Sequence, residues 1–320
     1  MLDTILRLPL GGQKQTVHIL SEDMSNPILL FLHGGPGVPD RGGVMTRCRA
    51  WASEFTLVTW DQRGCGGSYW GTDFSALTPD VLLSDAAELV KWLCTKFGRQ
   101  KLYLVCGSWG TELGTLLCSR YPEHIAAYFG QGQTVDGVKN EELSYHFALN
   151  EAASSGDEKS VQKLLKLGPP TGGQYRGGLR GLLTQRNIMK RYGGYSSKNR
   201  QIGFIASFAK SMAKSGEYSP LDLLGTALGS MRSLAALWGQ ITDYDFPSQC
   251  SQFVMPYYIF QGRNDNNTPA ALVQGFYDVI DAPAKDLVWF ENSAHSPLAD
   301  ETERFYTELR ARILPPHKID

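Results

Sequence analysis

The sequence lacks the features that mark membrane proteins, nucleic-acid-binding proteins and secreted proteins. Its 320 residues contain no run of about 18 apolar residues, so we expect no membrane-spanning helix. The formal net charge is −1, with 31 Lys and Arg against 32 Asp and Glu, which gives no reason to expect nucleic acid or an anionic membrane as a partner. The N-terminal residues lack the pattern of a signal peptide, and we therefore expect a cytoplasmic protein.

Cysteines are few and follow no pattern. No C-x-x-C pair occurs, so the sequence implies neither a zinc site nor a disulfide framework. We expect free and mostly buried thiols, and no bound metal or cofactor. The cysteines are Cys48, Cys65, Cys94, Cys106, Cys118 and Cys250.

Short apolar runs alternate with helical segments in both halves of the chain. After a hairpin around Gly11 and Gly12, the pattern predicts strands at 28–32, 55–60, 101–106, 125–129, 257–261 and 287–290. It predicts helices at 79–97 and 109–121, a helix beginning near 269 and a last one ending near 313. Such alternation indicates an α/β fold, a mostly parallel twisted sheet with helices on both faces.

The alternation stops in the middle of the chain. Residues 133–246 are mostly helical or Gly-rich and have little strand character. We interpret them as a helical cap, or lid, inserted into a core formed by residues 1–132 and 247–320.

Ser108 is the candidate nucleophile. The segment LVCGSWGTELG places it directly after a strand and directly before a helix. A serine on such a tight turn stands clear of the backbone, and the turn needs small residues two positions before and after it. Gly110 meets this requirement, whereas Cys106 stands where glycine is usual. The N–H of Trp109, at the start of the helix, is a candidate oxyanion donor.

The segment HGGPG, residues 33–37, follows the strand at 28–32 and is the candidate oxyanion loop. Its glycines let the backbone approach a ligand closely. In α/β hydrolases this loop supplies the second oxyanion N–H, for which we choose Gly35 and then Gly34. We interpret His33 as a structural residue that orients the loop.

A serine nucleophile needs a base, and the base needs an acid that holds its tautomer. Of the six histidines, only His295 lies in a small-residue loop directly after a late strand. Asp265 lies in the loop after the preceding strand. The order Ser108, Asp265, His295 is the order that this fold uses.

Five motifs together resemble the proline iminopeptidases and related serine peptidases: HGGPG, DQRG-x-GGS, GSWG, GR-x-D-x-x-TP and AH. The resemblance covers about residues 28–130 and 253–300. It implies the α/β-hydrolase fold with a helical cap, a triad of Ser108, Asp265 and His295, and oxyanion donors at Gly35 and Trp109. We interpret Asp61 and Arg63 of the DQRG motif as structural residues that tie their loop to the active-site edge.

The cap departs from what the resemblance implies. Proline iminopeptidases are expected to hold the α-ammonium of the substrate with cap carboxylates, yet no acidic residue occurs between Glu158 and Glu217. Other cap carboxylates, such as Glu141, Glu142, Glu151 and Asp243, belong to no motif. The stretch between Glu158 and Glu217 is basic, which fits either a solvated cap surface or attraction of an anionic or acyl substrate. Its basic residues include Arg176, Arg180, Arg186, Lys190, Arg191, Lys198 and Arg200.

The expected function is therefore hydrolysis of an amide or ester through an acyl-enzyme. The resemblance favours an aminopeptidase of the proline iminopeptidase type, acting on a short peptide. Two alternatives stay open: a carboxylesterase or amidase acting on a small non-peptide acyl compound, and a ligand-sensing protein with slow turnover. Dehalogenase and epoxide-hydrolase chemistry is disfavoured, because those enzymes use an aspartate where Ser108 stands. The sequence does not fix the oligomeric state.

Overall fold

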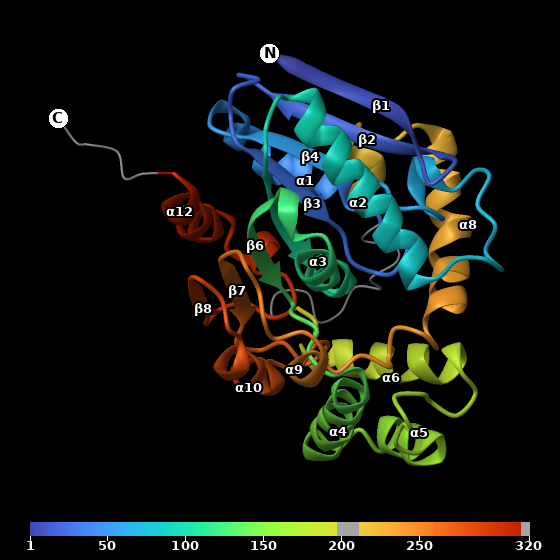
Figure 1. The fold of residues 1–320 in the computed structure, drawn as a ribbon. Helices are drawn as coiled ribbons and strands as arrows, with labels where there is room; N and C mark the ends of the chain where they lie inside the picture. The colour runs from blue at the N-terminus through green and yellow to red at the C-terminus, as the bar shows by residue number, and fades with distance from the viewer. Residues whose placement is uncertain (197–210, 315–320) are drawn as a thin grey trace.

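A computed structural model describes residues 1–196 and 211–314. One sheet of eight strands, in the order β1-β2-β4-β3-β5-β6-β7-β8, forms its centre (Figure 1). β1 pairs antiparallel with β2 and β2 antiparallel with β4, and every other neighbouring pair is parallel. The strands are β1 (Leu2–Leu10), β2 (Gln13–Ser21), β3 (Ile28–Leu32), β4 (Thr56–Trp60), β5 (Leu102–Gly107), β6 (Ile125–Gln131), β7 (Tyr257–Gly262) and β8 (Lys285–Phe290).

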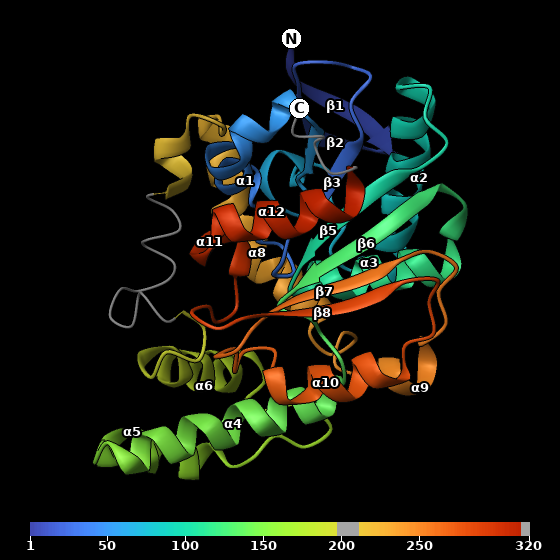
Figure 2. The same cartoon turned by 90° about the vertical axis from the view of Figure 1, so that its left-hand side faces the viewer.

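Helices cover both faces of the sheet (Figures 1 and 2). One hydrophobic core joins one face to α2 (Pro79–Lys96), α3 (Trp109–Arg120) and α10 (Ala270–Val279). A second core joins the other face to α1 (Arg41–Cys48), η1 (Arg49–Ser53), α11 (Pro297–Asp300) and α12 (Thr302–Ile313). Two short turns, η2 (Gly66–Ser68) and η3 (Pro122–His124), lie in connecting segments. The predicted parallel α/β architecture is confirmed.

Between β6 and β7 the described residues add no strand to the sheet and form five helices. They are α4 (Gly137–Ser154), α5 (Glu158–Leu167), α6 (Leu179–Arg191), α8 (Pro220–Leu237) and α9 (Phe246–Gln249). In both views α4, α5 and α6 lie together at the end of the molecule away from the N-terminus, around a small core of their own. Asp136 and Asp245 pair in an isolated antiparallel bridge, so the two ends of this segment lie side by side. The division into a core and a cap at 133–246 stays a prediction.

Most of the predicted elements are observed within two or three residues of their predicted ends. Thr78 caps α2 as expected, accepting a hydrogen bond from the Val81 N–H. The pattern did not predict α1, because its sequence RGGVMTRC has two glycines, two arginines and no clear apolar period. The long, apolar helix that a membrane span requires is not found among the helices of the described residues.

Candidate active site

Ser108 occupies a strained turn between β5 and α3. Its φ of 54° and ψ of −125° make it the one non-glycine residue with positive φ in the described chain. Such a conformation costs about 1–3 kcal/mol and persists only where the surroundings impose it. The Ser108 N–H donates to the Gln131 carbonyl at the end of β6 (3.0 Å), which fixes the turn between two parallel strands.

Two glycines let α3 pack closely under this turn. A Cβ on Gly110 would lie 2.1 Å from the Leu32 carbonyl oxygen, and a Cβ on Gly114 would lie 2.4 Å from the Cys106 sulfur. Cys106 is fully buried. The space that permits a cysteine two residues before Ser108 is therefore provided by Gly114 on the facing helix.

The HGGPG loop lies against Ser108. A Cβ on Gly34 would approach the Ser108 Cβ to 3.0 Å and its hydroxyl oxygen to 3.6 Å, so the loop backbone packs closely against the serine. Gly35 has a φ of 128°, which favours glycine as well. Trp109 is the first residue of α3, so no preceding helical turn offers a carbonyl to its N–H.

His33 holds this loop in place as a neutral imidazole. Its Nδ1 lies 2.8 Å from the Gly34 carbonyl oxygen, and its Nε2 accepts the Gln62 N–H at 3.2 Å. Burial lowers the pKa of His33 to about 4, although the bond to Gly34 acts in the opposite direction. Gln62 also accepts the Trp109 indole N–H (2.9 Å), so the loops after β3 and β4 and the start of α3 form one network.

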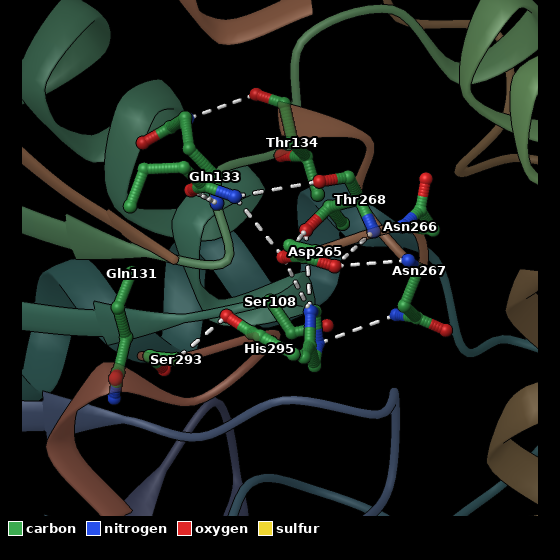
Figure 3. Close-up of polar contacts among 12 residues, drawn as sticks. Ser108, Gln131, Gln133, Thr134, Asp265, Asn266, Asn267, Thr268, Ser293 and His295 are labelled. Carbon is green, nitrogen blue, oxygen red and sulfur yellow. Dashed lines mark hydrogen bonds and ion pairs between the residues drawn. The ribbon is translucent and has the colours of Figure 1, made fainter. Parts of the chain in front are cut away.

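Asp265 and His295 form a buried pair at the ends of β7 and β8 (Figure 3). The His295 Nδ1 lies 2.9 Å from Asp265 Oδ2, and the two residues are 4% and 1% exposed. Asp265 Oδ1 accepts the backbone N–H groups of Asn267 and Thr268, while Oδ2 also accepts the Thr268 hydroxyl and the Gln261 amide. So many donors hold the carboxylate in one orientation.

The loop after β6 connects the two halves of the site. A Cβ on Gly132 would lie 2.8 Å from His295 Cε1, and the preceding Gln131 accepts the Ser108 N–H. Gln131 also accepts the Leu298 N–H through its side chain. Figure 3 shows Ser108 and His295 on neighbouring segments at this edge of the sheet. The residues that the sequence singled out thus lie together, although they are up to 261 positions apart in the chain.

The segment between β6 and β7 contacts both the Asp265 and the His295 loops. The His295 N–H donates to the Tyr195 carbonyl (3.1 Å), and the two rings lie 4.8 Å apart. The Asn266 N–H donates to the Gly194 carbonyl, and the Asn140 amide of α4 donates to the Asn267 carbonyl.

Two buried carboxylates near the site were not singled out by any motif. Glu112 lies one turn of α3 after Ser108, is 4% exposed, and has no hydrogen-bond or ion-pair partner in the described chain. Burial raises the pKa of Glu112 well above its ordinary value. Glu141 of α4 pairs with Arg186 through Oε1, whereas its buried Oε2 has no partner among the described residues. Both carboxylates raise the pKa of Tyr244, on which burial has the largest effect, so both lie within electrostatic reach of one phenol.

The DQRG motif is structural, but Asp61 and Arg63 have different partners from each other. Arg63 pairs with Asp85 of α2 (2.7 Å) and donates to the hairpin backbone at Gly11. Asp61 accepts the Gly67 N–H and lies 3.3 Å from Arg41. Arg63 therefore ties its loop to the β1–β2 hairpin and α2, rather than to the active-site edge. All six cysteines are free and buried, as predicted.

No grouping of three His, Cys, Asp or Glu side chains suited to a metal ion occurs in residues 1–196 and 211–314.

Known proteins share the fold of this chain. Residues 27–164, which include Ser108 and the HGGPG loop, match a family described as the alpha/beta hydrolase fold. The structure of a proline iminopeptidase from Mycobacterium smegmatis aligns with a TM-score of 0.66 over 97% of both chains, at 17% identity. The protein has the α/β-hydrolase fold.

This α/β hydrolase is also similar in sequence to aminopeptidases over nearly its whole length. It is 28% identical over 304 residues to a probable aminopeptidase, YbaC, of Bacillus subtilis, covering 94% of this chain and 93% of that one. It is 22% identical over 318 residues to a proline iminopeptidase of Lactobacillus acidophilus, covering 95% and 96%. The chain is thus a hydrolase of the α/β-hydrolase type that resembles the proline iminopeptidases.

Proposed function

We propose that this protein is a serine hydrolase that cleaves amide or ester bonds through an acyl-enzyme, and that its preferred substrate is a short peptide with a free N-terminus. One observation carries the proposal. A serine in a strained strand-to-helix turn lies beside a glycine loop and on a segment adjacent to a buried, hydrogen-bonded Asp–His pair. This combination has a chemical use as a catalytic triad with an oxyanion hole.

In the proposed mechanism His295 is the general base. With its Nδ1–H bonded to Asp265, its Nε2 carries the lone pair that takes the Ser108 proton as the hydroxyl attacks the carbonyl carbon. The N–H groups of Gly35 and Trp109, with Gly34 as the next candidate, stabilise the oxyanion. Each such donor contributes about 3–4 kcal/mol to lowering the barrier. His295 then protonates the leaving group, and water releases the acyl group from Ser108.

The two buried carboxylates support an amine-bearing substrate. Glu112 and Glu141 both act electrostatically on Tyr244, and Arg186 pairs with Glu141, so Glu112 has no cationic partner among the described residues. A buried carboxylate without a partner must bind a proton or a cation. The α-ammonium of a substrate held at Ser108 would supply that cation. We propose Glu112 as its main partner, because Glu141 is already bonded to Arg186.

A carboxylesterase or amidase acting on an anionic acyl compound is the second candidate. The Lys190 ammonium lies 4.9 Å from the centre of the Tyr195 ring, which in turn contacts His295. A cationic group this near the general base would favour a substrate with a carboxylate.

Two chromogenic substrates, proline p-nitroanilide and p-nitrophenyl acetate, test the proposal with wild type and Ser108→Ala. We expect the wild type to cleave the anilide and the variant to lose at least about 1,000-fold in turnover of both substrates while keeping its melting temperature. Cleavage of the ester alone would favour the second candidate. Full activity of Ser108→Ala would refute the serine mechanism.

A further inference from the structure

Asn267 contacts the atom of His295 that has to act as the base. Its side-chain Nδ2 lies 3.3 Å from His295 Nε2 (Figure 3). The opposite ring nitrogen, Nδ1, faces Asp265 Oδ2 at 2.9 Å and the Thr268 hydroxyl at 3.2 Å. Both nitrogens of the imidazole therefore have a polar partner from the same loop.

The chemistry of the ring decides the direction of this hydrogen bond. A neutral imidazole carries one N–H, and the Asp265 carboxylate, which can only accept, requires it on Nδ1. Nε2 is then an acceptor with one lone pair in the ring plane. The group of Asn267 that faces it must be the NH₂, in agreement with the observed orientation.

The same lone pair has to receive the Ser108 proton. An imidazole nitrogen accepts one well-directed hydrogen bond at a time, so Asn267 and Ser108 compete for Nε2. We propose that Asn267 is a positioning residue for the general base: its amide holds the His295 ring in orientation in the resting enzyme, and it yields Nε2 to Ser108 when a substrate is bound. This inference rests on the proposed role of His295.

The backbone of Asn267 holds its side chain in place. The Asn267 N–H donates to Asp265 Oδ1 (2.9 Å), and its carbonyl accepts the Asn140 amide from α4 (3.1 Å). The backbone of Asn267 is thus bonded to the acid on one side and to the inserted helix on the other, which fixes the point from which its side chain reaches Nε2. Movement of α4 relative to the sheet would shift the amide with respect to Nε2.

A donor aimed at Nε2 stabilises the neutral imidazole and opposes the imidazolium, whose N–H would face the NH₂ group. Asn267→Leu removes the donor and should raise the midpoint of the acid limb of kcat/KM by about 0.5–1 pH unit. Asn267→Asp replaces the donor by a carboxylate and should raise that midpoint further. The expected order of midpoints is Asp above Leu above the wild-type Asn, an order that loss of packing alone would not produce.

The other ionisable groups around the His295 imidazole are not altered by these substitutions, so they do not account for a difference in midpoint between the variants. Asp265 is bonded to Nδ1 and the Tyr195 ring packs against the imidazole. Lys190 lies over Tyr195, and Asp300 and Asp40 act on that phenol electrostatically.

Asn266 provides the matched control. It is the adjacent residue of the same type, and its side chain donates to the Asn264 carbonyl and not to His295. Asn266→Leu should leave the midpoint unchanged, and Asn266→Asp measures the long-range effect of one added charge. The proposal would be overturned if the Leu and Asp variants at position 266 shifted the midpoint as much as those at position 267. It would also be overturned if the Asn267 variants left the midpoint unchanged, or if Asn267→Leu lowered it.

NMR titration of the His295 ring in isotopically labelled full-length protein gives the same order without turnover, with His295→Gln for assignment. If NMR shows the expected order of His295 midpoints but Ser108→Ala is active, the serine mechanism is refuted and the contact between Asn267 and His295 is not. If Ser108→Ala is inactive but the His295 midpoints do not follow the expected order, only the role of Asn267 is refuted.

Discussion

At the scale of single residues, the Glu112 carboxylate, which has no partner among the described residues, gives the sharpest test of substrate class. Glu112→Gln keeps the shape and removes the charge. We expect KM for proline p-nitroanilide to rise at least about tenfold, since an ion pair in a buried site contributes roughly 1.5–3 kcal/mol. Steady-state kinetics with p-nitrophenyl acetate, which has no amine, should show little change.

The matched control for this variant is Glu123→Gln, which also removes a carboxylate but lies outside α3, in η3. Equal losses on the anilide and the acetate in Glu112→Gln would show that Glu112 stabilises the fold rather than an ammonium group. Higher thermal stability of this variant is expected, because it no longer buries an unpaired acid.

The site residues that the sequence predicted are those whose role is indicated by the residues next to them in the chain. Ser108 and the HGGPG loop have small residues at fixed spacing, and the close approaches at Gly110 and Gly34 show why small residues stand there. Glu112 was not predicted because the resemblance points to carboxylates of the cap, although an acid on the otherwise mostly apolar helix WGTELGTLLC was a usable signal. The contact of Asn267 with His295 could not be predicted, because it depends on how two loops meet in space.

At the scale of elements, α8 is held against the loops that follow β3 and β4. A Cβ on Gly229 would lie 2.1 Å from the Gly64 carbonyl oxygen, and one on Gly225 would lie 2.2 Å from the Gly66 carbonyl oxygen. Ser230 donates to the Gly37 carbonyl of the HGGPG loop (2.7 Å). A helix of the inserted segment thus buttresses the proposed oxyanion loop.

Gly229→Ala tests this packing. The added methyl group meets backbone, which cannot move aside cheaply, so we expect a loss of about 1–3 kcal/mol in the free energy of unfolding. Gly275→Ala in α10 is the matched control, because nothing lies within 4 Å of its Cβ position. It should stabilise the protein by about 0.5–1 kcal/mol through helix propensity. Urea denaturation of the two variants should therefore give opposite signs, and equal signs would count against the close packing of α8.

The elements that the sequence predicted best are those with strong periodicity and clear ends, such as α2 with its Thr78 cap. The short α1 was not predicted, since its position depends on partners distant in sequence. Arg41 at its start pairs with Asp222 of α8, 181 positions away, and with Asp61. Its burial depends on tertiary charge pairing and not on a local pattern.

At the scale of the whole molecule, two buried groups give the stability opposite dependences on pH. His33 has its pKa lowered to about 4 by burial, below its ordinary value of 6.5. The unfolded chain then binds a proton that the folded protein does not, so stability falls as pH falls from about 6.5 to 4. Burial raises the pKa of Asp61 to about 6, with Arg41 opposing the effect. Here the folded protein binds the proton first, so stability rises as pH falls from about 6 to 4.

These signs predict how two variants diverge. His33→Asn should be less stable than wild type at pH 7, because the bonds to Gly34 and Gln62 are lost. By pH 5 the wild type has lost about 2 kcal/mol through His33 that the variant does not lose, so the gap should narrow by that amount. Asp61→Asn removes the opposite dependence, and its stability relative to wild type should fall by about 1 kcal/mol over the same interval. Urea denaturation at pH 5, 6 and 7 measures both gaps, and gaps that change in the same direction would mean that one of the two groups is not buried in the charge state assigned to it.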